Sequence, residues 1–161
     1  MHPKTALQAL HNIHSILDQA IRALRGHKYD TMGERYVSLF NVVREDQRHA
    51  LTALTMACTI VKLASSTLLV NRGRDPIPLA ARVGVHCGPA AGASLGSLQP
   101  VLQLMGETLS WAELMESEGG INQVQVSEQL YEALPQAVRK LFQESHIESR
   151  SMVSGGASRL G

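Results

Sequence analysis

The feature that most constrains the fold is a change from helical to strand periodicity near the start of the chain. Apolar positions in residues 5–25 recur at steps of three and four, which predicts an amphipathic helix. Residues 28–32 and 35–43 are then predicted as two strands around a turn at Gly33-Glu34, because the second stretch is rich in β-formers. A helix that leads directly into a hairpin indicates a protein that packs helices on a sheet.

The pattern continues along the chain and predicts one α+β domain over residues 1–161, with helices on one side of an antiparallel sheet. Residues 71–76 are predicted as a loop from their Gly and Pro content, and residues 90–97 as a loop of small residues. Residues 154–158 are predicted to form a turn or a frayed tail. The other predicted elements are a helix over 46–69, strands over 79–87, 100–105 and 124–126, a helix over 107–117, and a helix capped by Ser127.

Composition narrows the classes of function. The formal net charge is +1, so no overall electrostatic field draws the chain toward nucleic acid or an anionic membrane. No stretch approaches the roughly 20 apolar residues of a membrane span, and no secretory signal is evident, which predicts a soluble intracellular protein. The low charged fraction of 18% suggests that a partner covers part of the surface. Cys58 and Cys87 are predicted to be buried free thiols, and His11 and His14 ordinary helix residues without a third metal ligand.

Several segments, in their order and spacing, resemble motifs of one enzyme family. Residues 28–37 are similar to a K-x-x-T-I-G-D-x-Y-M hairpin, and residues 85–89 to a strand end of the form I-H-T-G-P. Residues 106–117 are similar to G-D-T-V-N-x-A-S-R-M-E-S, and residues 123–127 to K-I-x-V-S. Together they resemble the catalytic domain of class III adenylyl and guanylyl cyclases. The resemblance covers about residues 10–150 and leaves 151–161 uncertain, and it implies a ferredoxin-like antiparallel sheet with helices packed on it.

The resemblance also implies where metal ions would bind. In the family two aspartates hold two Mg²⁺ or Mn²⁺ ions, because charge builds up on the phosphates during the reaction. Glu34 occupies the second aspartate position, and we expect it to face water in its turn. The first aspartate lies on a central strand that precedes the first helix, and the sequence starts too late to contain it. We therefore expect this N-terminal central strand to be missing, which leaves three outcomes open. The chain is a fragment, a partner fills the gap with a strand, or the remaining strands close up.

The positions that the resemblance assigns to catalysis and purine recognition carry other residues than the family's. Ser110 and Leu114 stand where the family has the Asn and Arg that orient the ribose and stabilise the transition state. Loss of one such contact typically costs ~10²–10³ in rate. Asp30 and Gln103 stand at the two purine positions and match neither the adenylyl nor the guanylyl pair. Asp30 could accept a hydrogen bond from guanine, although an exposed strand aspartate is the simpler interpretation.

These substitutions favour a catalytically inactive cyclase-like domain that serves as a structural, dimerisation or regulatory module. The alternatives are an active or half-site adenylate or guanylate cyclase, a nucleotide-binding sensor without turnover, and an unrelated α+β domain that shares short motifs by chance. We expect no cofactor, with Mg²⁺ or Mn²⁺ present only if a nucleotide binds. The expected partner is a protein, as a homodimer, as a heterodimer with another cyclase-like domain or within a larger complex, with no nucleic acid and no membrane insertion.

Overall fold

The computed structural model describes residues 3–31, 33–69, 77–98, 101–145 and 157–160. The chain forms two compact units, residues 1–81 and residues 82–161. Each unit combines helices with short paired strands, so the predicted α+β class is confirmed. The expectation of one domain over the whole chain stays a prediction.

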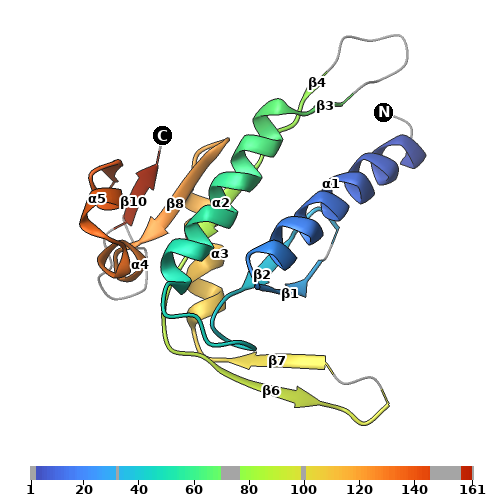
Figure 1. The fold of residues 1–161 in the computed structure, drawn as a ribbon. Coiled ribbons are helices and arrows are strands. Elements are labelled where there is room, and N and C mark those ends of the chain that lie inside the picture. Colours follow the sequence, from blue (N-terminus) through green and yellow to red (C-terminus); the bar gives the residue numbers. More distant parts are fainter. Residues whose placement is uncertain (1–2, 32, 70–76, 99–100, 146–156, 161) are drawn as a thin grey trace. The chain divides into compact units, whose positions relative to one another are not determined.

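The first unit holds two long helices and a hairpin (Figure 1). Its main strand pair, β1 with β2, is antiparallel and contains a register shift between Lys28 and Asp30. The short strands β3 and β4 form a second antiparallel pair. The elements are α1 (Pro3–Ala23), β1 (His27–Asp30), β2 (Val37–Leu39), α2 (His49–Ser66), β3 (Leu68–Leu69) and β4 (Ile77–Pro78).

The core of this unit lies between α1, α2 and the hairpin. Leu17 and Ile21 of the predicted apolar stripe are buried against Met56 of α2. Phe40 follows β2 and packs on the same cluster. A Cβ atom at Gly26 would lie 2.5 Å from the Phe40 ring, so a larger residue between α1 and β1 would require the side chains of Phe40 and Ile21 to move.

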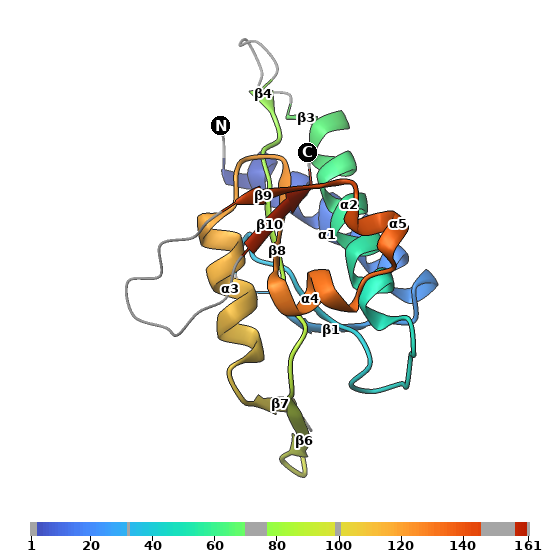
Figure 2. The ribbon, with the colours of Figure 1, turned by 90° about the vertical axis from the view of Figure 1, so that its left-hand side faces the viewer.

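The second unit is built on a mixed four-stranded sheet, with the strand order β5-β8-β10-β9. β5 and β8 are parallel, and the other two neighbouring pairs are antiparallel. α3 packs on β5 and β8 (Figure 2). The elements are β5 (Arg82–Val85), β6 (Ala91–Leu95), β7 (Val101–Met105), α3 (Thr108–Glu118), β8 (Gln123–Ser127), α4 (Glu128–Ala133), α5 (Gln136–Arg139), β9 (Phe142–Ser145) and β10 (Ala157–Leu160).

Three details of the sequence prediction require correction. The sheet is mixed, because a helical crossover through α3 returns the chain to the end of the sheet where β5 began. Residues 91–95, predicted within a loop, form β6 and pair with β7 in a separate antiparallel hairpin. Residues 157–158, predicted as part of a turn or tail, belong to β10, which pairs with β8 and β9. The predicted loop 71–76 and residues 154–156 lie outside the described residues.

Two predictions about composition can be compared with the structure. Cys58 and Cys87 are free thiols, as expected, but both are half-buried, and burial raises the pKa of each. Across the described ranges, no helix is long and apolar enough to span a bilayer.

Candidate functional site

The hairpin of the first unit carries two of the predicted site residues. Asp30 ends β1, and its Oδ2 accepts a hydrogen bond from the Arg35 guanidinium at 3.1 Å. Glu34 is exposed in the turn, where Gly33 adopts a φ of +61° that favours glycine. The carboxylate at the purine position is therefore engaged by a cation of its own hairpin. Sequence reasoning missed Arg35, because the pairing depends on how the turn folds back.

Asp18 of α1 fixes this hairpin to the helix. Its carboxylate accepts hydrogen bonds from Lys28 Nζ at 3.0 Å and from the Tyr36 hydroxyl at 2.8 Å. Burial acts to raise the pKa of Asp18, but the two hydrogen bonds outweigh it and hold the pKa below its usual value. Burial and the neighbouring carboxylate raise the pKa of Tyr36, so this residue remains a donor. The hairpin that carries Glu34 is thus bound to α1 on both sides of its turn.

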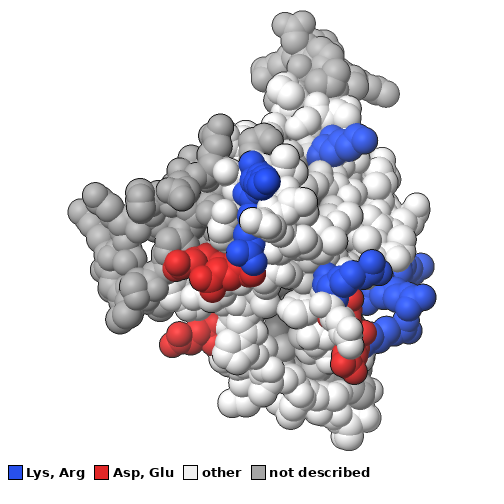
Figure 3. Space-filling model, turned by 60° about the vertical axis from the view of Figure 1, so that its left-hand side comes forward, with Lys and Arg blue, Asp and Glu red and all other residues white. Residues whose placement is uncertain are grey.

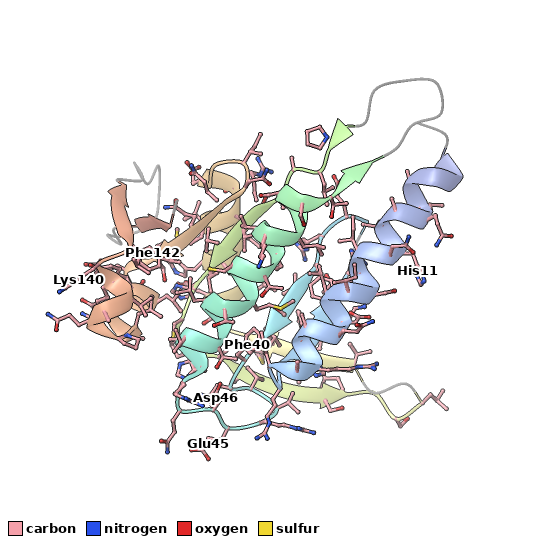
Figure 4. All side chains as sticks on the ribbon, turned by 45° about the horizontal axis from the view of Figure 1, so that its top comes forward. His11, Phe40, Glu45, Asp46, Lys140 and Phe142 are labelled. Atoms are coloured by element: carbon pink, nitrogen blue, oxygen red, sulfur yellow. The ribbon has the colours of Figure 1, made fainter. Side chains whose placement is uncertain are left out.

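The loop that leads from the hairpin into α2 is held by its own side chains. Asp46 accepts hydrogen bonds from the Arg48 backbone N–H at 2.8 Å and from Thr52 Oγ1 at 2.7 Å. Asn41, with a φ of 62°, accepts one from the Asp46 backbone N–H. Figure 4 shows Asp46 next to Glu45 on this loop. Asp46 thus satisfies donors at the start of α2, so its carboxylate has a structural role.

In the second unit, His86 is the centre of a small polar cluster after β5. Its Nδ1 lies 2.8 Å from Ser127 Oγ, which also accepts a hydrogen bond from the Leu130 backbone N–H as the predicted cap of α4. The imidazole stacks on Trp111 of α3, with ring centroids 5.9 Å apart. Burial lowers the pKa of His86, which favours the neutral ring. Sequence reasoning did not assign this cluster, since its members lie far apart along the chain.

The segment between β5 and α3 closes tightly beside this cluster. Thr108 donates a hydrogen bond to the Pro89 carbonyl at 2.6 Å. A Cβ atom at Gly88 would lie 2.6 Å from His86 Nε2 and 3.0 Å from Thr108 Oγ1. The predicted G-P motif is therefore a packing site in this fold, where a side chain at position 88 would require its neighbours to move.

The remaining predicted site residues lie on α3 and β7. Ser110 is exposed in the first turn of α3, and Leu114 is half-buried one turn later. Gln103 is exposed on β7, opposite Ala93 of β6. The structure therefore places Asp30 and Glu34 in the first unit and Ser110, Leu114 and Gln103 in the second.

Positive charge is absent from a long part of the second unit. Between Arg82 and Arg139 the sequence contains no lysine or arginine, while α3 alone carries Glu113, Glu116 and Glu118. Arg82 itself binds Glu116 with Nε 2.8 Å from Oε1. On the face drawn in Figure 3, charged side chains form small groups within a mostly uncharged surface. Within the described ranges, no cluster of three or more His, Cys, Asp or Glu side chains is placed to hold a metal ion.

Comparisons with known proteins give a consistent result. The sequence profile of the Adenylate and Guanylate cyclase catalytic domain matches residues 1–158. Atrial natriuretic peptide receptor 2 of Homo sapiens is 30% identical over 133 residues, which are 82% of this chain and 12% of that receptor. Guanylyl cyclase, membrane, of Dictyostelium discoideum is 28% identical over 145 residues, which are 89% of this chain and 9% of that protein. The chain thus spans only a small part of the length of these relatives.

Solved structures agree in fold. The dimeric guanylyl cyclase domain of the RhoGC fusion protein from the fungus Blastocladiella emersonii superposes with a TM-score of 0.84 at 19% identity, covering 99% of this chain and 85% of that one. The adenylyl cyclase CyaB from P. aeruginosa superposes with a TM-score of 0.82 at 14% identity, covering 100% of this chain and 84% of that one. At these identities the likeness concerns the fold alone.

Proposed function

Given that the chain belongs to the adenylate and guanylate cyclase catalytic domain family, we propose that it is a catalytically inactive member that acts through contacts with another protein. The observation that supports this proposal most directly is Leu114 on α3, which stands at the position that the family motif gives to arginine. A half-buried hydrocarbon side chain has no charge with which to stabilise a phosphate in the transition state. Ser110, one turn earlier, offers a shorter hydrogen-bonding group than the asparagine of the motif.

The cation that contacts α3, Arg82, is already paired with Glu116. The sequence from Val83 to Val138 has no lysine or arginine, and burial favours the neutral form of His86 within it. Expulsion of pyrophosphate requires several kcal/mol of electrostatic stabilisation, which positive groups or metal ions normally provide. The charged side chains of this segment are all glutamates, which disfavour the approach of a triphosphate.

The described residues do not fit the paired metal ions of the family. Glu34 is a single exposed carboxylate in a turn, and Asp30 of the same hairpin is already bound to Arg35. A divalent ion in such enzymes needs several hard oxygen ligands held at one point. We therefore propose that neither Mg²⁺ nor Mn²⁺ is a resident cofactor of this chain.

A role in assembly is supported by the nature of the relatives. One relative is a natriuretic peptide receptor by name and another is a membrane guanylyl cyclase, and the matched region is a small part of each of these longer proteins. One matching solved structure is described as a dimeric domain and another, from the same fungal protein, as a monomeric one. We propose that the chain pairs with a second copy or with another cyclase-like domain.

A nucleotide titration tests the proposal. ATP or GTP with Mn²⁺ or Mg²⁺ is titrated into the purified chain in a calorimeter, and the mixture is then analysed for cyclic product by chromatography. We expect neither binding heat nor product. Binding without product would replace the proposal with a nucleotide sensor, and product that disappears in Glu34→Ala would replace it with an active cyclase.

A further inference from the structure

The net charge of +1 conceals an uneven distribution of charge between the two units. Residues 1–81 carry ten Lys and Arg against six Asp and Glu, and residues 82–161 carry five against eight. The first unit therefore has a surplus of four positive charges, although the whole chain has only one. Because salt screens charges more than about 10 Å apart, a partner responds to such a local surplus and not to the total.

Some cations of the first unit are already paired, and others are not. Lys28 binds Asp18, and Arg35 binds Asp30. Four further arginines are exposed, and none of them forms an ion pair with a described residue: Arg22, Arg25, Arg44 and Arg48. Their guanidinium groups are therefore available to a partner outside this unit.

These four arginines come from two segments that meet in the fold. The first two lie at the C-terminal end of α1, and the other two lie in the loop from β2 to α2. Gly26 follows α1 and Phe40 begins the loop, and a Cβ atom at Gly26 would lie 2.5 Å from the Phe40 ring. Figures 1 and 2 both show this loop beside the end of α1. The arginines therefore gather at one end of the first unit.

The same loop exposes two neighbouring apolar side chains. Val42 is 38% exposed and Val43 is 58% exposed. The hydrogen bonds of Asp46 and Asn41 fix the course of the loop without covering either valine. Together with the four arginines, these two valines form what we call the basic patch.

The backbone of Arg25 is a second sign that the patch serves a partner. Arg25 has a φ of 56°, in the left-handed region that glycine usually occupies at a helix end. The Gly26 N–H closes this end of α1 by donating to the Ile21 carbonyl at 2.9 Å. An arginine is less easily accommodated there than glycine, and its exposed side chain forms no ion pair within the described part of the chain. A residue that folding does not favour at its position points to a role outside the fold.

The acidic residues of the loop only partly offset the arginines. Glu45 is exposed, and the Asp46 carboxylate accepts hydrogen bonds from the Arg48 backbone N–H and from Thr52. Four arginines against these two carboxylates leave a surplus of two positive charges. A surface with cations around exposed hydrocarbon fits an anionic bilayer, which presents negative head groups directly above an apolar layer. An acidic protein would have to supply carboxylates and an apolar recess in one fixed arrangement.

We propose that the basic patch docks the first unit on the surface of a bilayer that contains anionic phospholipid. The arginines lie among the head groups, and Val42 and Val43 reach the boundary of the acyl chains. This is a peripheral contact that needs no membrane-spanning helix, no nucleotide and no catalysis. Since only two positive charges are in surplus, we expect weak binding that salt suppresses.

Co-sedimentation of the full chain with vesicles tests the patch. Vesicles of phosphatidylcholine with about 30% phosphatidylserine should bind the chain at low salt, and pure phosphatidylcholine should bind it at least about tenfold less. Raising NaCl to about 500 mM should release the chain. Arg25→Glu and Arg44→Glu should each lower the partition coefficient at least about fivefold. Val43→Asp should also lower it, and Glu45→Gln should raise it.

Lys62→Glu is the matched control, because it makes the same change of charge in the same unit. Lys62 is exposed on α2, about 20 Å further along the helix than Arg48 at a rise of about 1.5 Å per residue. It should leave binding unchanged. All of these side chains are exposed, so each variant should keep the wild-type circular dichroism spectrum and urea midpoint.

Three results would overturn the proposal. The first is a wild type that stays in the supernatant with anionic vesicles at low salt. The second is a Lys62→Glu variant that loses as much binding as Arg44→Glu, which would show attraction by overall charge without a patch. The third is a chain that ignores vesicles but binds poly-L-glutamate through Arg44, which would identify an acidic protein as the partner.

Discussion

Gly84 of β5 should be intolerant of any side chain, because α3 packs directly on its Cα. A Cβ atom there would overlap the backbone nitrogen of Glu116 and the backbone oxygen of Ala112, and would lie 2.8 Å from Glu116 Cα. Because the two overlapping atoms lie closer still, an ordinary contact of about 3.5 Å requires α3 to retreat by more than about 1 Å. Overpacking of this kind typically costs about 1–3 kcal/mol of unfolding free energy.

The assay uses the only tryptophan, Trp111, which lies beside Ala112 on α3 and stacks on His86. In urea unfolding followed by its fluorescence, Gly84→Ala should lower the midpoint by roughly 1 M, for an m-value of about 1–3 kcal/mol/M. The native spectrum of Gly84→Ala should also change as the stack loosens. Since α3 carries Ser110 and Leu114, this contact sets where both residues lie.

Gly120→Ala is the matched control. A Cβ atom at Gly120 would meet Oε1 of Gln123 at 2.5 Å, and this end of a flexible side chain can move aside. It should therefore cost less than about 0.5 kcal/mol. The reasoning fails if Gly84→Ala unfolds at the wild-type midpoint, or if Gly120→Ala is equally destabilising.

Three further predictions concern the polar clusters. Tyr36→Phe removes a hydrogen-bond donor to Asp18 and should lower the free energy of unfolding of the first unit by about 1 kcal/mol, a value already discounted for partial exposure. Urea unfolding followed by circular dichroism measures this change, and an unchanged midpoint would show that the hydrogen bond is energetically neutral. The folded-state pKa of Asp18 lies below its ordinary 3.8, so its stabilisation is complete above 3.8 and lost as pH falls through the lower value. The urea midpoint of the wild type should therefore drop between about pH 5 and pH 2 by more than that of Asp18→Asn, and equal drops would contradict the shift. Burial lowers the pKa of His86 below 6.5, so the second unit should lose stability as pH falls from 6.5 to the folded-state pKa. Unfolding followed by Trp111 fluorescence measures this loss, and His86→Gln should remove it.

The sequence predicted most helices and strands, because their signals are local. The stripe of Leu17 and Ile21 predicted α1 and its buried face, and Ser127 predicted the cap of α4, which the structure confirms. β6 was missed, because Ala91-Gly92-Ala93-Ser94-Leu95 has little strand propensity and becomes a strand by pairing with β7. The parallel pairing of β5 with β8 was also missed, since the choice of strand partner is not a local property.

The candidate site was predictable as a set of positions but not as a set of interactions. The motif spacing predicted that Ser110 and Leu114 share α3, one turn apart, and the structure places them so. It did not predict that Arg35 would bind Asp30, because a register shift in the hairpin determines which side chains meet across the turn. The sequence shows the absence of lysine and arginine between Arg82 and Arg139. The structure adds that this segment forms β5, the β6–β7 hairpin and α3, the helix that carries Ser110 and Leu114.

The most direct test of the central claim is product formation at a chain concentration above that at which it self-associates. The chain is incubated with GTP or ATP and Mn²⁺, and cyclic nucleotide is measured by chromatography against heat-denatured chain. The account predicts no product above that background at any concentration. Product that rises with chain concentration and disappears in Glu34→Ala would contradict it, and would mean that this chain catalyses cyclisation without an arginine at position 114.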